Sequence, residues 1–355
     1  MNGTKKNLFV AMIAALLAIT AAGSALTGDM DGDGVVNASD AASLFRMVTG
    51  VSDPLPGADI TGNNAITRAD VRSELLYACG KIRNFSFLTE TLSGELLGEE
   101  ALERFAYNGI VRTKTGYQSA TVSASVTETE FQNSVCYVLD FYVRDVTCFR
   151  SAFASGEYNG KRQRAKDMAV ANGAAFAVTG DMYEMNAGGA IVRNGVWYNE
   201  SKGVTKKKDI CVLYTDGTME IFEKGTATLE ALKQGRPIWQ MWVFGPSLLD
   251  AEGEVMSEFN CSPKILDNNP RSAIGYFGPG HYCLVVVDGR QRPYSSGLRM
   301  EDLSDLMYQL GCAAADNLDG GKSAIMVDGE GSEISNPSGG GRVISDIVYI
   351  GEPVA

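Results

Sequence analysis

Short apolar runs, each closed by turn-forming residues, dominate the chain after residue 81. Three runs rich in β-branched and aromatic residues predict strands: Cys136–Val146, Asp209–Phe222 and His281–Arg290. The second run contains Thr215-Asp216-Gly217-Thr218, which is typical of a hairpin turn. The pattern therefore predicts a large domain built mainly from strands.

Apolar residues at helical spacing interrupt the strands in two places, Arg164–Ala174 and Met300–Cys312. The second helix is expected to end at Gly311, as a helix C-terminus commonly does. Strands with a few interspersed helices predict an α+β class with a mixed sheet for residues 81–355.

The first 25 residues have the pattern of a secretory signal peptide. Lys5 and Lys6 precede an apolar run from Leu8 to Ile19, and small residues follow at 22–25. A retained membrane anchor is the alternative, but the apolar run is short for a membrane span. We therefore expect a secreted or extracellular protein.

The overall composition narrows the function classes. The chain has 355 residues, 45% of them hydrophobic, which is enough for more than one domain. Its net charge of −12 argues against a nucleic-acid partner, because binding to a phosphate backbone needs clustered cations. The basic run Lys206-Lys207-Lys208 is expected to be a solvated turn.

Cysteine and histidine usage gives no zinc pattern. The one histidine, His281, is expected at a hairpin tip, although a Ser-His pair stays open. An odd number of cysteines leaves at least one free thiol, and no disulfide pairing can be assigned. The seven cysteines contain no CxxC pair: Cys79, Cys136, Cys148, Cys211, Cys261, Cys283 and Cys312.

Residues 28–80 contain two candidate calcium loops of twelve residues, with oxygen-bearing residues at the ligand positions of an EF-hand loop. In the first loop Gly34 permits the sharp turn, and a helix with Ala42, Phe45 and Val48 at helical spacing follows. The second loop has Asn64 in place of the glycine and less charge, which predicts weaker binding. The candidate Ca²⁺ ligands are Asp29, Asp31, Asp33, Val35 (through its carbonyl), Asn37 and Asp40 in the first loop, and Asp59, Thr61, Asn63, Thr67 and Asp70 in the second.

Two such loops, each closed by Asp and followed by a helix, resemble a dockerin, which is a small all-α calcium-binding module. The resemblance implies structural Ca²⁺ and attachment to a cohesin-bearing scaffold protein, as in cellulosome-like assemblies. It places partner choice at Ala38, Ser39, Arg68 and Ala69. A calcium-stabilised spacer without a partner is the alternative.

In the large domain, polar residues gather beside glycines in four clusters: Ala177–Gly195, Trp242–Gly253, Asn268–Arg290, and Asn317–Gly329 continued by Asn336–Ile350. Gly321-Lys322-Ser323 is not a phosphate loop, because Asp316 stands where a Walker A loop needs glycine. Arginines near glycine-rich backbone suit an anionic group such as phosphate. Carboxylates in the same clusters suit acid–base chemistry or binding of sugar hydroxyls.

The order of the motifs resembles the phosphodiester glycosidases, the family of N-acetylglucosamine-1-phosphodiester alpha-N-acetylglucosaminidase. The motifs are Gly-Asp-x-Tyr from Gly180, Phe-Gly-Pro-x-Leu from Phe244, Pro-Arg-Ser-Ala-Ile-Gly from Pro270, Val-Val-Asp-Gly-Arg from Val286, and Asn-Leu-Asp-Gly-Gly-x-Ser from Asn317. A last motif has Asn336-Pro337 ahead of the final arginine, Arg342. The likeness spans residues 84–350.

Carried over residue by residue, the resemblance implies an active cleft. Its catalytic candidates are Asp319, Asp288 and Asn317. Its substrate-binding candidates are Arg271, Arg290, Gly320, Gly321, Ser323, Asp181, Tyr183 and Arg342. Thr179 and Lys322 depart from the residues usual in the family, which puts the choice of substrate in doubt.

The implied reaction is hydrolysis of a sugar–phosphodiester at the anomeric carbon of a phosphorylated glycan, with no organic cofactor. Arg271 and Arg290, with Arg342 as a weaker candidate, would stabilise the phosphate that leaves. Asp319 or Asp288 would activate water or act as nucleophile. A non-catalytic phosphoglycan-binding module and a glycoside hydrolase with no phosphate requirement remain open.

Overall fold

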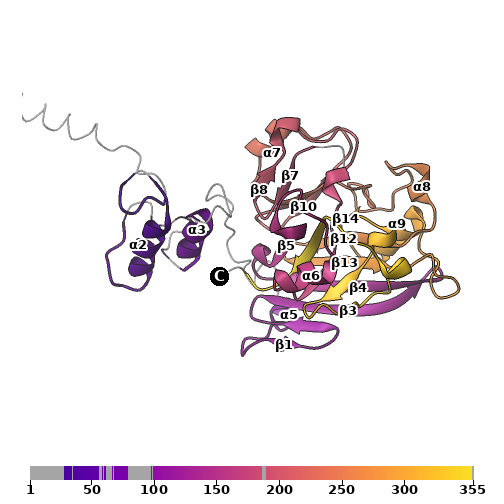
Figure 1. Cartoon of the computed structure of the whole chain (residues 1–355), viewed down its shortest axis with the longest axis horizontal. Coiled ribbons are helices and arrows are strands. Elements are labelled where there is room, and N and C mark those ends of the chain that lie inside the picture. Colours follow the sequence, from indigo (N-terminus) through magenta and orange to yellow (C-terminus); the bar gives the residue numbers. More distant parts are fainter. Residues whose placement is uncertain are drawn as a thin grey trace, which may run out of the picture. The chain divides into compact units, whose positions relative to one another are not determined.

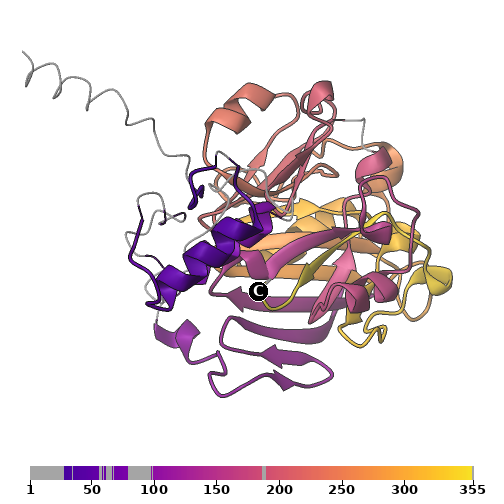
Figure 2. The same cartoon turned by 60° about the vertical axis from the view of Figure 1, so that its left-hand side comes forward.

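The computed structural model describes residues 28–33, 35–55, 58, 60, 66, 68–78, 97, 99–185 and 189–353. These residues fall into two compact units, one before and one after residue 85 (Figures 1 and 2). The signal peptide expected at residues 1–25 lies outside the described residues. Within the described ranges, no helix combines the length and the apolar character that a membrane crossing requires.

The small unit contains the helices α2 (Ala38–Val48) and α3 (Arg68–Ala78). Asn37 caps α2: its side chain accepts from the N–H of Ser39, and its own N–H donates to Asp40 at 2.8 Å. The buried face of α2 carries Ala41, Leu44 and Met47, whereas Phe45 is exposed. The helix was predicted correctly from the apolar spacing. The predicted residues Ala42, Phe45 and Val48 are not the buried ones, since Ala42 and Phe45 are exposed and Val48 is half-buried.

Three antiparallel sheets form the large unit. The largest has seven strands in the order β1-β2-β3-β4-β13-β12-β14. Its strands are β1 (Val111–Arg112), β2 (Gly116–Gln118), β3 (Val122–Phe131), β4 (Ser134–Val143), β12 (Arg271–Gly278), β13 (His281–Val287) and β14 (Ala314–Asn317). The hairpin strands β1 and β2 thus lie at one edge of this sheet, and β14 lies at the opposite edge.

The other two sheets are smaller. One has the order β10-β9-β11-β7-β8, and the other has the order β15-β6-β16-β5. Their strands are β5 (Phe149–Phe153), β6 (Phe176–Thr179), β7 (Ile191–Arg193), β8 (Val196–Tyr198), β9 (Ile210–Tyr214), β10 (Met219–Phe222), β11 (Ile238–Trp242), β15 (Met326–Asp328) and β16 (Asp346–Ile350). The helices of the large unit are α5 (Glu99–Leu102), α6 (Ala165–Ala171), α7 (Leu229–Gln234), α8 (Pro263–Leu266) and α9 (Met300–Gln309).

One hydrophobic core joins all three sheets. Phe141 of β4, Trp242 of β11 and Val348 of β16 are fully buried members of the same cluster. On the other face of the large sheet, Leu303 and Met307 of α9 pack against a second cluster that includes strand residues of β4 and β13. Burial of this apolar surface is the main force that holds the sheets together.

The α+β class is confirmed, and each of the three runs predicted as strands contains at least one. The predicted mixed sheet is wrong, because every strand pair in the described residues is antiparallel. The run Asp209–Phe222 forms the hairpin of β9 and β10. Gly311 follows α9 with a positive φ of 87°, as expected for the residue after a helix C-cap. The apolar run Ala324–Val327 is only partly a strand, because Gly321–Ser323 form a 3-10 turn and β15 begins at Met326.

The six described cysteines are all free thiols, and Cys79 lies outside the described residues. Cys283 and Cys312 are the notable pair, with their Sγ atoms 3.8 Å apart in the core. A β-carbon on Gly275 would lie only 2.6 Å from both sulfur atoms. The glycine therefore provides the space that the two thiols share.

Candidate functional site

The family-like motifs converge at one end of the strands β13, β12 and β14. In this antiparallel arrangement Val287 pairs with Arg271, and Ala273 pairs with Asn317. The N–H of Gly321 donates to the carbonyl of Pro270 at 2.9 Å, which ties the loop after β14 to the start of β12. Segments about 50 residues apart in sequence thus form a single sheet end, which we call the motif end.

Asp319 is the least buried of the three candidate carboxylates, with 8% of its side chain exposed. Its Oδ2 lies 3.2 Å from Nη2 of Arg342, whose side chain is 40% exposed. The Nε of Arg342 donates to the hydroxyl of Ser323 at 2.6 Å. Burial raises the pKa of Asp319, while Ser323 and Arg342 oppose that rise. The arrangement presents a carboxylate, a guanidinium and a hydroxyl together.

The glycines after Asp319 allow close approach of the backbone and of Arg290. A β-carbon on Gly320 would lie 2.7 Å from the carbonyl oxygen of Pro270. Gly321 has a φ of 62°, and a β-carbon there would meet the guanidinium of Arg290 at 3.5 Å. Arg290 is exposed and also donates to Asn269 at 2.5 Å. Glycine is therefore required at position 320 by the close approach of Pro270, and it is favoured at position 321 by the left-handed φ.

Arg271 is placed differently from Arg290. Its Nε donates to the carbonyl of Leu298 at 2.9 Å, and its Nη2 donates to the carbonyls of Ile265 and Asp267. Burial lowers its pKa to about 10, with a smaller contribution from Arg290. Through these hydrogen bonds Arg271 links the backbone of residues 265–267 to that of residue 298.

Asn317 is turned into the protein. Its amide donates to the carbonyl of Gly245 at 2.9 Å, and its Oδ1 is buried without a hydrogen-bond partner. The side chain is 1% exposed. Asn317 therefore holds the Phe-Gly-Pro loop of residues 244–246 in place through its hydrogen bond to Gly245.

Asp288 is covered by neighbouring groups. Its Oδ2 accepts from the hydroxyl of Tyr294 at 2.8 Å, and both oxygens accept from the N–H of Asn336. Desolvation raises the pKa of Asp288 to about 6, although these hydrogen bonds lower it. Asp288 is 1% exposed, so a substrate would reach it only after Tyr294 moves.

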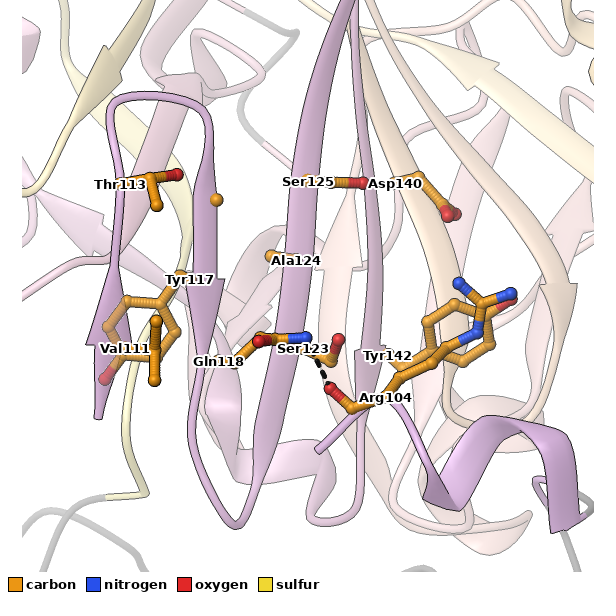
Figure 3. A pocket seen from close by; sticks show the side chains of 11 residues that line it. Arg104, Val111, Thr113, Tyr117, Gln118, Ser123, Ala124, Ser125, Asp140 and Tyr142 are labelled. Carbon is orange, nitrogen blue, oxygen red and sulfur yellow. Dashed lines mark hydrogen bonds between the residues drawn. The ribbon is translucent and has the colours of Figure 1, made fainter. Parts of the chain in front are cut away.

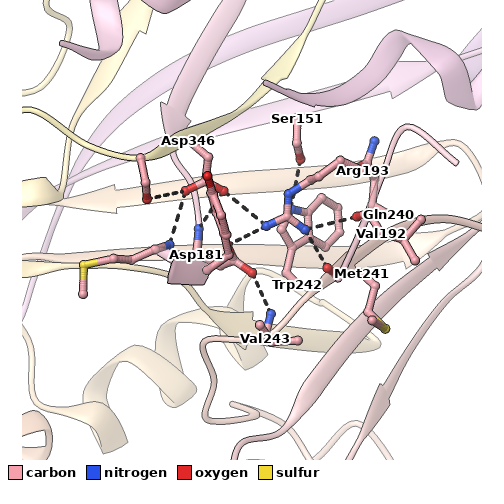
Figure 4. Close-up of polar contacts among 12 residues, drawn as sticks. Ser151, Asp181, Val192, Arg193, Gln240, Met241, Trp242, Val243 and Asp346 are labelled. Atoms are coloured by element: carbon pink, nitrogen blue, oxygen red, sulfur yellow. Dashed lines mark hydrogen bonds and ion pairs between the residues drawn. The ribbon is translucent and has the colours of Figure 1, made fainter. Parts of the chain in front are cut away.

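Asp181 belongs to a buried ion network, shown in Figure 4. Arg193 lies between the two carboxylates, 2.6 Å from Oδ1 of Asp181 and 3.2 Å from Oδ2 of Asp346. The second oxygen of Asp181 accepts from the N–H of Val243. Burial raises the pKa of Asp346 to about 8, with Asp181 adding to the rise. Asp181 thus fixes β7 and β11 near the motif end.

Tyr183 lies in an aromatic cluster. Its ring packs against Phe153 and Tyr158 at centroid distances of 5.0 and 5.3 Å. Its hydroxyl accepts from the N–H of Asn159, and burial raises its pKa to about 12. The ring anchors the segment that also carries Met182, whose sulfur contacts Arg342.

Sequence reasoning missed three residues that shape the site: Arg193, Tyr294 and Asp346. Arg193 lies in an ordinary strand, and its partner Asp346 follows it by 153 positions. Tyr294 stands six positions after Asp288 and has no motif around it. No local pattern marks these residues, because their partners come from distant segments.

The small unit contains a group of carboxylates that can hold a cation. Oxygen atoms of Asp29, Asp31 and Asp40 all lie within 4.8 Å of one another. The carboxylate of Glu74 is fully buried without a hydrogen-bond partner, and burial, then Asp40 and Asp29, raises its pKa to about 8. Hard oxygen donors of this kind match Ca²⁺. Of the second loop, Asp59, Thr61, Asn63 and Thr67 lie outside the described residues, and Asp70 is buried at the start of α3.

Comparison with known proteins places the large unit in a family. The model of the phosphodiester glycosidase family matches residues 172–351, about half of the chain, and the chain belongs to this family. The match includes the motif end and the Asp181 network. Membership implies a glycosidase-type hydrolase.

One solved structure supports the fold. The catalytic domain of zebrafish N-acetylglucosamine-1-phosphodiester alpha-N-acetylglucosaminidase, described as auto-inhibited by its pro-peptide, aligns with a TM-score of 0.53. It shares 20% identity, and the alignment covers 65% of this chain and 83% of that one. A hypothetical protein from Synechocystis aligns at 14% identity with a TM-score of 0.45, covering 65% of this chain and 62% of that one. A search of curated protein sequences gave no match.

Proposed function

We propose that the chain is an exported hydrolase that cleaves the anomeric sugar–phosphate bond of glycan phosphodiesters, such as N-acetylglucosamine-1-phosphodiesters. The observation that carries the proposal is the Asp319–Arg342–Ser323 group beside the glycines at the motif end. Family membership supplies the reaction class, and the zebrafish enzyme supplies the example of the substrate.

In this proposal the two accessible arginines bind the phosphate. Arg342 is part-exposed and Arg290 is exposed, so both guanidinium groups are open to an anion from solvent. When the bond between C1 and the phosphate oxygen breaks, the electron pair stays on a phosphate that is already a stable anion. Fixed cations stabilise that charge without a proton donor. Arg271 takes no part in this step, since carbonyls hold its Nε and Nη2.

Asp319 acts at the anomeric carbon. It either accepts a proton from the water that attacks C1, or attacks C1 itself and is released by water afterwards. Its raised pKa increases its basicity, and Arg342 favours its ionised form. Asp288 is the alternative carboxylate, with Tyr294 covering it. Asn317 positions the loop and does not contact the sugar.

The test uses the full chain with the methyl phosphodiester of α-N-acetylglucosamine-1-phosphate, and free sugar is measured by chromatography. Asp319→Asn is expected to lower kcat at least 100-fold. Asp305→Asn on α9, a carboxylate that accepts from Gln309, is the matched control with unchanged turnover. Equal rates in Asp319→Asn and the wild type would refute the assignment.

A second substrate separates the alternatives. Methyl α-N-acetylglucosaminide carries no phosphate, and we expect no hydrolysis of it. Hydrolysis of both substrates would indicate a glycoside hydrolase without a phosphate requirement. Binding of the phosphodiester in a calorimeter without turnover would indicate a phosphoglycan-binding module.

The proposal includes a calcium-binding dockerin in the small unit. The carboxylates of Asp29, Asp31 and Asp40, which already lie close together, would hold Ca²⁺ in the first loop. Exposed Phe45 and Leu75 on α2 and α3 would contribute apolar surface to a cohesin of a scaffold protein. A calcium-stabilised spacer would bind the ion in the same way but no cohesin.

Calorimetric titration of the full chain with CaCl₂ tests this part independently of catalysis. Asp31→Asn is expected to weaken the first binding event at least tenfold, because Ca²⁺ affinity depends on ligand charge. Asp53→Asn, an exposed carboxylate outside the loop, serves as the control. Absence of Ca²⁺ binding by the wild type at millimolar concentration would refute the calcium site.

A further inference from the structure

Glu74 of α3 occupies a position that the first repeat fills with an apolar residue. The helices α2 and α3 have 11 residues each, and aligning them end to end matches Asp70 with Asp40 and Glu74 with Leu44. Leu44 and Glu74 are both 0% exposed. The second repeat therefore places a carboxylate where the first repeat contributes a leucine to the hydrophobic core.

The carboxylate of Glu74 has no partner in the part of the chain that the structure describes. Both of its oxygen atoms are buried without a hydrogen bond. Burial of a carboxyl group without a hydrogen bond or a counter-ion destabilises the folded state, and burial of an ionised carboxylate does so most. A leucine at this position would avoid that cost, so the carboxylate indicates a group that compensates for its burial.

The face of α3 that carries Glu74 packs against the first calcium loop. Val71, one turn before Glu74 on the same face, belongs to the same hydrophobic cluster as Met30, which is a residue of that loop. Burial, then Asp40 and Asp29, raises the pKa of Glu74, so these two carboxylates lie near it. Packing and electrostatics thus place Glu74 on the side of α3 that faces the loop.

The loop itself brings three more carboxylates together. Oxygen atoms of Asp29, Asp31 and Asp40 lie within 4.8 Å of one another. Backbone N–H groups fix Asp40: its Oδ1 accepts from Met30 at 2.8 Å and from Asp31 at 3.2 Å, and its Oδ2 accepts from Asn37 at 2.8 Å. Ca²⁺ is the cation that binds six to eight oxygen ligands from several segments of a chain.

Two carboxylates of the large unit show what distinguishes Glu74. Asp140, which lines the cavity in Figure 3, lies 2.7 Å from Nε2 of His281 and therefore has a partner. Asp316 is buried without a hydrogen bond, as Glu74 is, but no group of metal-ligating side chains surrounds it among the residues described. Glu74 combines the two features, a missing partner and a cation loop beside it.

We propose that Glu74 holds the Ca²⁺ of the first loop from the α3 side, so that the bound ion joins the two helices. This inference rests on the calcium site of the proposed function and adds a ligand from outside the loop. Another carboxylate raises the affinity, because Ca²⁺ affinity depends on ligand charge. The ion would also fix α2 relative to α3, and with them the exposed side chains of Phe45 and Leu75.

Calorimetric titration of the full chain with CaCl₂ tests the inference with two substitutions. Glu74→Gln keeps the shape of the side chain but removes its charge, and Glu74→Leu copies the residue of the first repeat. Both variants are expected to raise the Kd of the first binding event at least tenfold. Glu103→Gln removes the same charge from an exposed glutamate of the large unit and should bind Ca²⁺ like the wild type.

Hydrogen exchange measured by mass spectrometry tests the link between the helices, at Ca²⁺ concentrations that saturate each protein. In the wild type, Ca²⁺ is expected to slow exchange in residues 29–40 and in residues 68–78. In Glu74→Leu the protection of residues 29–40 should remain, whereas the added protection of residues 68–78 should be lost. Equal protection of α3 in the two proteins would overturn the link.

Thermal unfolding checks that each variant folds, and the two substitutions make different demands on the core, so either one can decide the test. Wild-type Kd in the Glu74 variants, with Asp31→Asn weakened, would overturn this inference and leave the calcium site in place. Absence of Ca²⁺ binding by the wild type would overturn both. Neither measurement uses turnover, so the proposed hydrolase activity is tested separately.

Discussion

Arg342 reaches across from the C-terminal segment to contact Asp319 at 3.2 Å, and its Nε donates to Ser323 on the same loop. One arginine thus orients both the carboxylate and the hydroxyl. Its side chain is also part-exposed, so it can touch a bound phosphate while it holds Asp319 in place. The family resemblance made Arg342 a weaker phosphate-binding candidate than Arg271; from these contacts we infer the opposite order.

Arg342 provides a direct test of this reversal. Arg342→Gln is expected to lower kcat/KM for the phosphodiester about 100-fold, since removal of one fixed charge from a transition state has this effect. Arg342→Lys keeps the charge but loses the double contact, and it should retain part of the activity. Steady-state kinetics with both variants measure the effect. Wild-type kcat/KM in Arg342→Gln would exclude Arg342 from the site.

Arg271 is expected to stabilise the folded state. Arg271→Gln leaves the carbonyls of Ile265, Asp267 and Leu298 without their donor, so the free energy of unfolding should fall by about 3 kcal/mol. Urea unfolding measures this change. Arg292→Gln, at an exposed position, is the control and should stay within about 0.5 kcal/mol. Undiminished stability with loss of substrate binding would instead restore Arg271 to the phosphate site.

Asp288 should make stability depend on pH. Its folded pKa of about 6 lies above the ordinary value of 3.8, so the folded state holds the proton more tightly than the unfolded state. The stabilisation that protonated Asp288 gives the folded state is therefore greatest at low pH and is lost as pH rises through 6. Ionisation of Asp288 between pH 4.5 and 7.5 should lower the free energy of unfolding by about 2 kcal/mol.

Asp288→Asn isolates this contribution, because the amide keeps an acceptor for Tyr294 but does not ionise. Urea unfolding of both proteins across that pH range should show the variant gaining relative stability as pH rises. Parallel pH profiles would contradict the raised pKa. Asp346 and Asp316 also have raised pKa values, and the comparison cancels their effects.

Gly180 should tolerate no side chain. A β-carbon there would lie 2.2 Å from Oδ2 of Asp346, and Arg193 fixes that carboxylate. Gly180→Ala is therefore expected to lower the free energy of unfolding by about 3 kcal/mol. Gly278→Ala, where a β-carbon meets nothing within 4 Å, should be close to neutral. Similar thermal stability of the two variants would show that the Asp346 network can move.

Local pattern predicted the fold class, the hairpin of β9 and β10, and the helices α6 and α9 of the large unit. These features depend on residues that are neighbours in sequence. Local pattern did not show that the motifs converge; the family resemblance implied it, and the backbone brings the ends of β13, β12 and β14 together. Local pattern also failed for side-chain partners: from one short loop, Asn317 donates to the carbonyl of Gly245, whereas Asp319 contacts the part-exposed Arg342. Such differences depend on partners such as Gly245 and Arg342, which no spacing rule identifies.

The four-stranded sheet has its last strand in chain order at an inner position, since β16 lies between β6 and β5. During synthesis β5 and β6 emerge early but have no shared neighbour until residues 346–350 have been made. Asp346, which begins that strand, then supplies the carboxylate for Arg193 and the support for Gly180. Arg193 and Gly180 therefore gain these contacts only after β16 has been made, so the part of the fold that surrounds them is completed late in synthesis.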